Sequence, residues 1–234
     1  MKRIAAVAVT ALLAAPAAAD VNVGIDQSDA PWLGFMNVFE LDGSTFVFGS
    51  GWGVPDLTTS FDDGANSLTF GPNTIGDPNE FWYQGGRPGE DPNDPNDNGG
   101  PGAAGNKVME ANLFQQVSDG SLSGTTVNFS GTILADTLTG AHVASVFIRD
   151  FAEDFSSVNE TLVQLDDSGS FNISLDTIDD GTARNVQWGI QVKGVNVWVT
   201  DVAPFGSITF ATVPAPGAVA LLGLGGLVAG RRRR

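Results

Sequence analysis

The chain has 234 residues, no cysteine and a large excess of acidic side chains. Six of its 11 Lys and Arg residues lie in residues 1–19 or 213–234, which leaves five against 27 Asp and Glu in residues 20–212, a formal charge of −22 there. This composition excludes the clustered basic surface that nucleic acids and anionic lipids require, and without cysteine there is no disulfide, thioether-linked haem or cysteine zinc site.

The N-terminus has the three parts of a secretory signal peptide. Lys2 and Arg3 supply the positive charge, residues 4–15 are apolar, and the alanines at 17–19 provide the small residues of a cleavage site. The sequence therefore predicts a signal peptide over residues 1–19 and a mature chain that begins at Asp20. The remaining segment, residues 20–212, is long enough for one domain with a substantial core.

Short runs rich in Val, Phe, Thr and Ile recur through this segment, separated by Gly, Asp, Asn and Ser. Several alternate between apolar and polar residues, which is typical of a strand with one buried face. The predicted strands are 37–41, 45–49, 67–71, 107–117, 125–130, 143–151, 161–165, 170–175, 185–193, 195–200 and 207–211. So many short strands without helical periodicity predict an all-β fold, with two antiparallel sheets packed face to face as a β-sandwich or jelly roll.

Residues 71–105 differ from the rest because they hold six prolines and many Gly, Asn and Asp residues. The middle of this segment, residues 89–100, is too polar to bury apolar surface, so we expect a mobile loop. Its acidic residues from Asp91 to Asp97 lack the Gly and the terminal Glu of a calcium-binding hand loop. We interpret them as part of a solvated linker.

Three successive aromatic residues, Phe81, Trp82 and Tyr83, lie in this polar segment. Aromatic rings that stack on the apolar face of a sugar are the usual platform of glycan-binding proteins, so the sequence predicts ligand-binding roles for all three. The alternative is that the rings close one end of the sandwich. Trp188 and Trp198 lie in predicted strands and are expected in the core.

Several motifs in the body resemble those of galactose-binding-like jelly-roll carbohydrate-binding modules. The opening is Asn37-Val38-Phe39-Glu40 followed by Gly51-Trp52-Gly53, residues 112–117 and 126–130 are similar to middle strands, and residues 197–202 are similar to a closing strand. The resemblance implies a non-catalytic jelly roll that binds polysaccharide.

In that family, an early Glu and a late Asp commonly help to bind a structural calcium ion, and Glu40 and Asp201 match them by position. Calcium takes six to eight oxygen ligands, and the first and last strands of a jelly roll often lie side by side, which would let the two carboxylates meet. The resemblance therefore implies Ca²⁺ at Glu40 and Asp201. The alternative is that both are ordinary carboxylates at strand ends or in loops.

No group of residues predicts catalysis. His142 is the only histidine, lies at the start of a predicted strand and has no activated-serine motif nearby, so we expect a solvated side chain. The acidic pairs at 62–63, 153–154 and 166–167 resemble turns. Two carboxylates can hydrolyse a glycoside, but a chain this acidic produces such pairs by chance.

The C-terminal tail, residues 213–234, is a possible membrane stop. Val213-Pro214-Ala215-Pro216 precedes the uncharged residues 217–230, and four arginines end the chain. As a helix, these 14 uncharged residues would be roughly 21 Å long, short for a bilayer core of about 30 Å, and including residues 213–216 reaches only the lower limit for spanning. The arginines favour the cytoplasmic side.

This tail resembles the PEP-CTERM sorting signal of Gram-negative bacteria, with Ala215 at the position of the name-giving Glu. The resemblance implies recognition and removal of the tail by an exosortase-type enzyme, after transient anchoring in the inner membrane, and export to the cell surface or extracellular matrix. The alternative is a plain C-terminal membrane anchor.

Together these features predict an exported, non-catalytic surface or matrix protein that associates with polysaccharide. Two alternatives stay open, namely a structural or adhesive matrix protein without a sugar site, and a glycan hydrolase or lyase.

Overall fold

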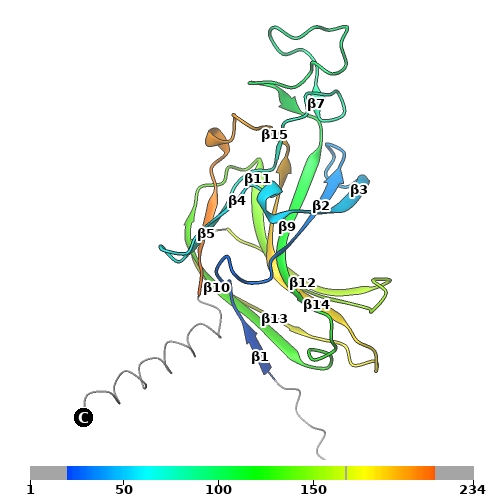
Figure 1. Cartoon of the computed structure of the whole chain (residues 1–234), viewed down its shortest axis with the longest axis vertical. Coiled ribbons are helices and arrows are strands. Elements are labelled where there is room, and N and C mark those ends of the chain that lie inside the picture. The colour runs from blue at the N-terminus through cyan, green and yellow to red at the C-terminus, as the bar shows by residue number, and fades with distance from the viewer. Residues whose placement is uncertain (1–19, 167, 214–234) are drawn as a thin grey trace, which may run out of the picture.

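The computed structural model describes residues 20–166 and 168–213 of the chain (Figure 1). About half of these residues lie in strands and very few in helices, which confirms the all-β prediction. The predicted signal peptide and the predicted transmembrane segment lie outside the described residues. No helix within residues 20–166 and 168–213 has the length and apolar character needed to cross a membrane.

Two six-stranded sheets make up the body of the fold. The first has the order β1-β10-β16-β5-β4, with β13 also paired to β10; its strands are β1 (Asp20–Val23), β4 (Thr59–Asp62), β5 (Ser67–Phe70), β10 (Thr126–Asp136), β13 (Gly169–Asp176) and β16 (Ile208–Ala211). The second has the order β12-β11-β14-β9-β2-β3; its strands are β2 (Leu33–Phe39), β3 (Phe46–Trp52), β9 (Val108–Val117), β11 (His142–Phe151), β12 (Val158–Gln164) and β14 (Asn185–Val195).

Four shorter strands and two 3₁₀ turns complete the fold. They are β6 (Thr74–Ile75), β7 (Tyr83–Gln84), β8 (Ala104–Gly105), β15 (Val197–Trp198), η1 (Val54–Asp56) and η2 (Ala203–Phe205). Strand β15 pairs in parallel with β6, and β1 pairs in parallel with β10. The other strand pairs are antiparallel, so the fold is the predicted antiparallel sandwich except at these two parallel strand pairs.

Alternation along the strands places the core between the two sheets. In β14, Val186, Trp188, Ile190 and Val192 are buried and belong to the core cluster, as their spacing predicts. Phe70, Phe129 and Phe210 face them from the first sheet and are fully buried. Burial of this apolar surface, at about 25 cal/mol per Å², is the main source of stability in a chain without disulfides.

The predicted loop, residues 71–105, contains short strands and repeated turns. Asp94 N donates to Asp91 O and Asp97 N donates to Asp94 O, both at 3.0 Å. Arg87 Nη2 donates to the carboxylate of Asp97 at 3.1 Å, and Asp91 N donates to the same carboxylate at 2.7 Å. The segment therefore closes on itself through its own acidic residues, an organisation that its composition does not predict.

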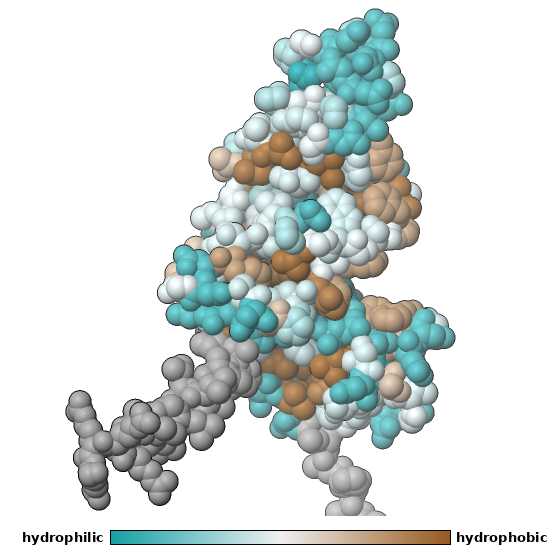
Figure 2. Space-filling view, in the orientation of Figure 1, coloured by the Kyte–Doolittle hydropathy of each residue, from teal (hydrophilic) through white to brown (hydrophobic). Residues whose placement is uncertain are grey.

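The two ends of the described chain, at β1 and after β16, lie at the opposite end of the molecule from this loop (Figure 1). Val213 forms a parallel bridge with Asp26, close to the start of the described chain. The loop around β7 forms the other end, and Figure 2 shows that its surface is strongly hydrophilic, whereas apolar side chains are exposed at several places on the body.

Candidate functional site

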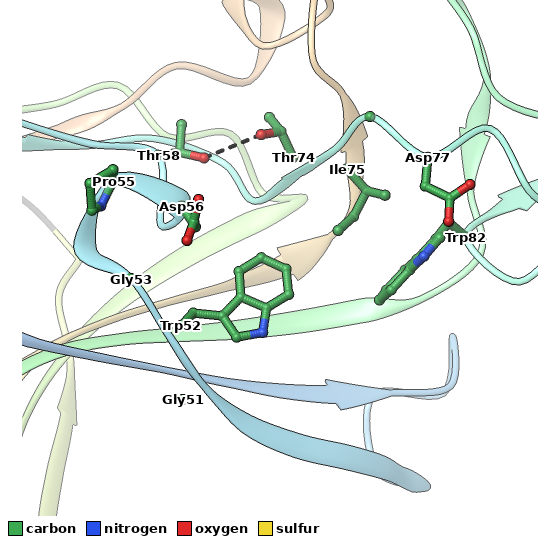
Figure 3. Close-up of a pocket in the computed structure, with 11 residues that line it drawn as sticks. Gly51, Trp52, Gly53, Pro55, Asp56, Thr58, Thr74, Ile75, Asp77 and Trp82 are labelled. Carbon is green, nitrogen blue, oxygen red and sulfur yellow. Dashed lines mark hydrogen bonds between the residues drawn. The ribbon is translucent and has the colours of Figure 1, made fainter.

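An open cleft with a volume of about 740 Å³ lies between two tryptophans, Trp52 and Trp82 (Figure 3). Its polar side chains come from separate elements: Asp56 from η1, Thr58 from the turn after η1, Thr74 from β6 and Asp77 from the loop that follows. The cleft thus brings together two stretches of the sequence, residues 51–58 and 74–82.

Strand pairing fixes the position of Trp52. It is the last residue of β3 and lies opposite Gly34 of β2. A Cβ atom at Gly34 would stand 2.5 Å from the Trp52 carbonyl oxygen and 2.8 Å from Leu57 Cδ1, so only glycine fits there. The indole Nε1 of Trp52 donates to Ser50 Oγ at 3.0 Å, which orients the half-buried ring beside the cleft.

Hydrogen bonds and aromatic packing hold Trp82. Its backbone N donates to Asn79 O at 3.0 Å, and its carbonyl accepts from Asn196 Nδ2 at 2.9 Å. Its ring packs edge-on against Phe81, with centroids 4.7 Å apart, and against Phe48 at 6.2 Å. Trp82 is therefore a half-buried ring with a fixed position, in keeping with a preformed binding surface.

The polar side of the cleft combines carboxylates and hydroxyls. Asp56 and Asp77 are exposed, and Thr58 Oγ1 and Thr74 Oγ1 lie 3.4 Å apart. Thr58 has φ of 46°, a left-handed conformation that is strained for a β-branched residue. Such strain concentrates at functional sites. The cleft thus offers aromatic surface next to hydrogen-bonding groups that suit a polyhydroxylated ligand.

The other two predicted aromatic ligands lie elsewhere. Phe81 is 37% exposed, and Lys107 Nζ lies 4.6 Å from its ring centroid; it lines a different hollow of about 490 Å³. Tyr83 is fully buried, its hydroxyl donates towards the carbonyl oxygens of Ile75 and Val197, and its burial raises its pKa to about 12. Tyr83 therefore has a structural position and offers no ring face to a ligand.

The residues of the predicted calcium site make separate contacts. Glu40 forms an ion pair with Lys107 at 3.1 Å, whereas Asp201 accepts from Gly102 N at 2.6 Å and from Thr200 Oγ1 at 3.0 Å. The strand before Asp201, β15, pairs with β6 and not with β2, the strand before Glu40. Nowhere in residues 20–166 and 168–213 do three or more His, Cys, Asp or Glu residues form a group that could hold a metal ion. The two carboxylates thus have different partners, and the calcium site stays a prediction.

His142 is buried, which corrects the expectation of a solvated side chain. It is only 2% exposed, and its Nε2 lies 2.9 Å from Val195 O. Burial lowers the pKa of its imidazole. Gly194 lies opposite His142 in the β11–β14 pair and leaves room for the ring, because a Cβ there would stand 2.2 Å from His142 Cδ2. The strand pattern alone did not reveal this close approach.

Of the predicted sorting motif, only Val213 lies in the described part of the chain. Its backbone N donates to Ile25 O at 2.8 Å. Pro214, Ala215 and Pro216 lie outside the described residues.

Sequence reasoning missed most of the cleft. The sequence-based prediction includes Trp52 only as part of a Gly-Trp-Gly motif and gives it no ligand. It contains none of the polar cleft residues, Asp56, Thr58, Thr74 and Asp77. A local signal exists for η1, since Pro55 and Asp56 are typical of the first turn of a helix. No local signal brings η1 next to β6.

Comparison of this chain with protein-family models, with curated proteins and with solved structures finds no match in any of the three. Both family resemblances therefore stay predictions, and any functional argument depends on the site itself.

Proposed function

We propose that this protein is an exported, non-catalytic protein of the cell surface or extracellular matrix that binds polysaccharide through the Trp52–Trp82 cleft. The observation that carries the proposal is that two indole rings from distant segments line one open cleft together with exposed carboxylates and hydroxyls. A concave site with aromatic walls and a few polar groups is the usual form of a small-molecule or oligosaccharide site.

The chemistry of the cleft matches that of a sugar chain. The C–H face of a pyranose is apolar and packs on an indole ring, while its hydroxyls donate to carboxylates such as those of Asp56 and Asp77. The charge of residues 20–212, −22, opposes an anionic glycan. We therefore infer that the ligand is a neutral polysaccharide.

The Trp82→Ala variant tests the cleft. Removal of an interface anchor typically costs about 1–3 kcal/mol of binding free energy, roughly 5- to 150-fold in Kd. We expect this loss for the neutral glycan that the wild type selects on a glycan array, measured by calorimetry. Phe46→Ala is the matched control, because Phe46 is 58% exposed, packs on Phe39 and does not line the cleft; it should bind as the wild type does.

The alternative functions give different results in the same experiments. If Trp82 only closes the end of the sandwich, Trp82→Ala should cost about 3–5 kcal/mol of unfolding free energy in urea melts, and the wild type should bind no glycan. That outcome would favour a structural or adhesive matrix protein. Release of reducing ends from a bound polysaccharide would instead identify a hydrolase or lyase.

Export and processing are the second part of the proposal. We infer from the sequence that residues 1–19 are removed by signal peptidase and that an exosortase-type enzyme removes most of residues 213–234. The intact mass of the protein isolated from its native cells tests this, and both segments should be missing. A mass that still includes Arg234 would support a simple membrane anchor.

A further inference from the structure

A second groove lies on the outer face of the sheet β12-β11-β14-β9-β2-β3, the face turned away from the core. It has a volume of about 610 Å³. It is lined by Phe35, Asn37, Phe114, Gln116, Arg149, Phe151, Phe155 and Gln187. None of these residues lines the Trp52–Trp82 cleft, so the two sites are separate.

Strand alternation shows that the groove lies outside the main core. Val146 and Ile148 belong to the core cluster, so Phe147 and Arg149 between and beyond them point outward. Phe147 is nevertheless fully buried, because the guanidinium of Arg149 lies 3.9 Å from its ring centroid and Phe114 lies 6.5 Å away. Phe147 therefore supports Arg149 from below, and the aromatic rings that line the groove itself are those of Phe35, Phe114, Phe151 and Phe155.

Amide side chains lie along the groove and beneath Arg149, and hydrogen bonds hold them in place. Asn112 Oδ1 accepts from Arg149 Nη1 at 2.9 Å and from Gln191 Nε2 at 3.1 Å. Gln187 Nε2 donates to Gln116 Oε1 at 2.6 Å. Fixed amides can present donors and acceptors to a ligand at little cost in side-chain entropy.

The charges of the groove compensate each other. Arg149 Nε lies 2.5 Å from Glu160 Oε1 in an ion pair, and Arg149 is the only basic residue that lines the groove. The groove thus has no free positive charge to attract an anion, and the rest of the acidic body repels one. A neutral, polar chain with apolar faces fits this surface.

Phe155 is an exposed aromatic residue that lines the groove. It lies in the β11–β12 hairpin, is 54% exposed and packs on Phe151 with centroids 5.4 Å apart. Its φ is 60°, and its backbone N donates to Ala152 O at 2.9 Å, a turn position that favours Gly or Asn. Because backbone strain of this kind clusters at functional sites, we take the exposed ring of Phe155 as the candidate ligand contact of the groove.

We propose that this groove is a second binding site for a neutral oligosaccharide segment. The class of ligand follows the proposed function, but the site is independent of the Trp52–Trp82 cleft. Two sites on different faces would let one molecule bridge two polysaccharide chains, with an avidity beyond that of either site. The protein would then cross-link a glycan matrix.

The test is titration calorimetry with cellohexaose, xylohexaose and mannohexaose as probes, together with tryptophan fluorescence. The groove contains no tryptophan, whereas the cleft contains two. Wild type should bind two equivalents of a probe, and only one binding event should change the fluorescence. Phe155→Gly should lower the stoichiometry to one and leave the fluorescence response intact, while Trp82→Ala should shift that response to roughly 5- to 150-fold higher probe concentration.

Phe155→Gly should fold, because glycine adopts positive φ without strain, and Phe155→Asn provides a second variant that tolerates this conformation. Phe46→Ala is the matched control, since Phe46 is 58% exposed and lines neither site. If the wild type binds one equivalent, and both Phe155 variants bind that equivalent unchanged, the groove is not a binding site and the cleft remains one. If binding is lost in Phe155→Gly but not in Trp82→Ala, the groove is the binding site and the cleft is not. No binding of any probe would overturn both.

Discussion

Strained residues coincide with the two candidate binding sites. The non-glycine residues with positive φ in the described chain are Thr58, Asn66 and Phe155. Asn66 lies in the tight turn between β4 and β5, where Asn is common. Thr58 lines the cleft and Phe155 lines the groove. Left-handed backbone costs roughly 1–2 kcal/mol per residue, so the presence of these two residues at the candidate sites favours a role for their side chains in binding.

His142 should make stability fall with decreasing pH. Its pKa is lowered in the folded state by burial, whereas in the unfolded chain it lies near the ordinary 6.5. As pH falls below about 6.5, the unfolded chain takes up the proton first, so unfolding becomes more favourable by up to about 1.4 kcal/mol per pH unit, until the folded pKa is reached. Above 6.5 both states are neutral and the effect is absent.

Urea melts between pH 7.5 and 5 measure this effect. The comparison variant is His142→Gln, whose side chain does not titrate, so that the difference between the two proteins isolates the histidine from the many carboxylates. The difference should change as pH decreases, with the wild type losing stability relative to the variant. Parallel pH profiles would show that the histidine titrates equally in the folded and unfolded states.

At the scale of elements, a buried ion pair joins the end of β11 to the segment before β14. Arg184 Nε donates to Asp150 Oδ1 at 2.6 Å, and both side chains are almost fully buried. Asp150 Oδ2 also accepts from Ile178 N at 2.7 Å. Loss of one partner would leave the other charge buried without compensation.

We expect Arg184→Met to lower the unfolding free energy by about 3–5 kcal/mol. Asp180→Ala is the control, because Asp180 also pairs with Arg184, at 2.8 Å, but its side chain is 41% exposed; its loss of stability should be much smaller, because solvent screens an exposed ion pair. Denaturant melts of the two variants decide this. Equal losses would mean that burial does not set the strength of these pairs.

Long strands were predictable because their pattern is local. Each of the eleven predicted strands has a counterpart, and β14 shows the clearest alternation. Strands β1, β4, β6, β7 and β8 were missed, since they have two to four residues and depend on distant partners. Strand β1 lies beside β10, more than 100 positions away in the chain, and no local signal encodes that pairing.

The candidate site was predictable only in part for the same reason. Composition pointed to Trp82, but it did not separate Trp82 from its buried neighbour Tyr83, because exposure depends on which strands surround them. The rest of the cleft comes from η1 and β6, which only the folded chain brings together. The resemblance that paired Glu40 with Asp201 used position along the chain, whereas in the fold Glu40 contacts Lys107 and Asp201 contacts Gly102.

At the scale of the whole molecule, the position of the chain ends suits surface attachment. The described chain begins and ends at one end of the sandwich, and the loop next to Trp82 lies at the other (Figure 1). A protein held through its C-terminal tail would therefore present the cleft away from its attachment point. The acidic body would at the same time keep anionic polymers away.

The most direct test of glycan binding in the cleft uses the indole N–H signals of the five tryptophans in a two-dimensional NMR titration with the same neutral hexasaccharides. A ligand in the cleft should shift the signals of Trp52 and Trp82. The signals of Trp32 and Trp188 should stay in place, because Trp32 Nε1 donates to Gln27 O and Trp188 is buried. Single Trp→Phe variants assign the signals. Indole signals that do not move with any probe, or that move only for tryptophans outside the cleft, would contradict the proposal.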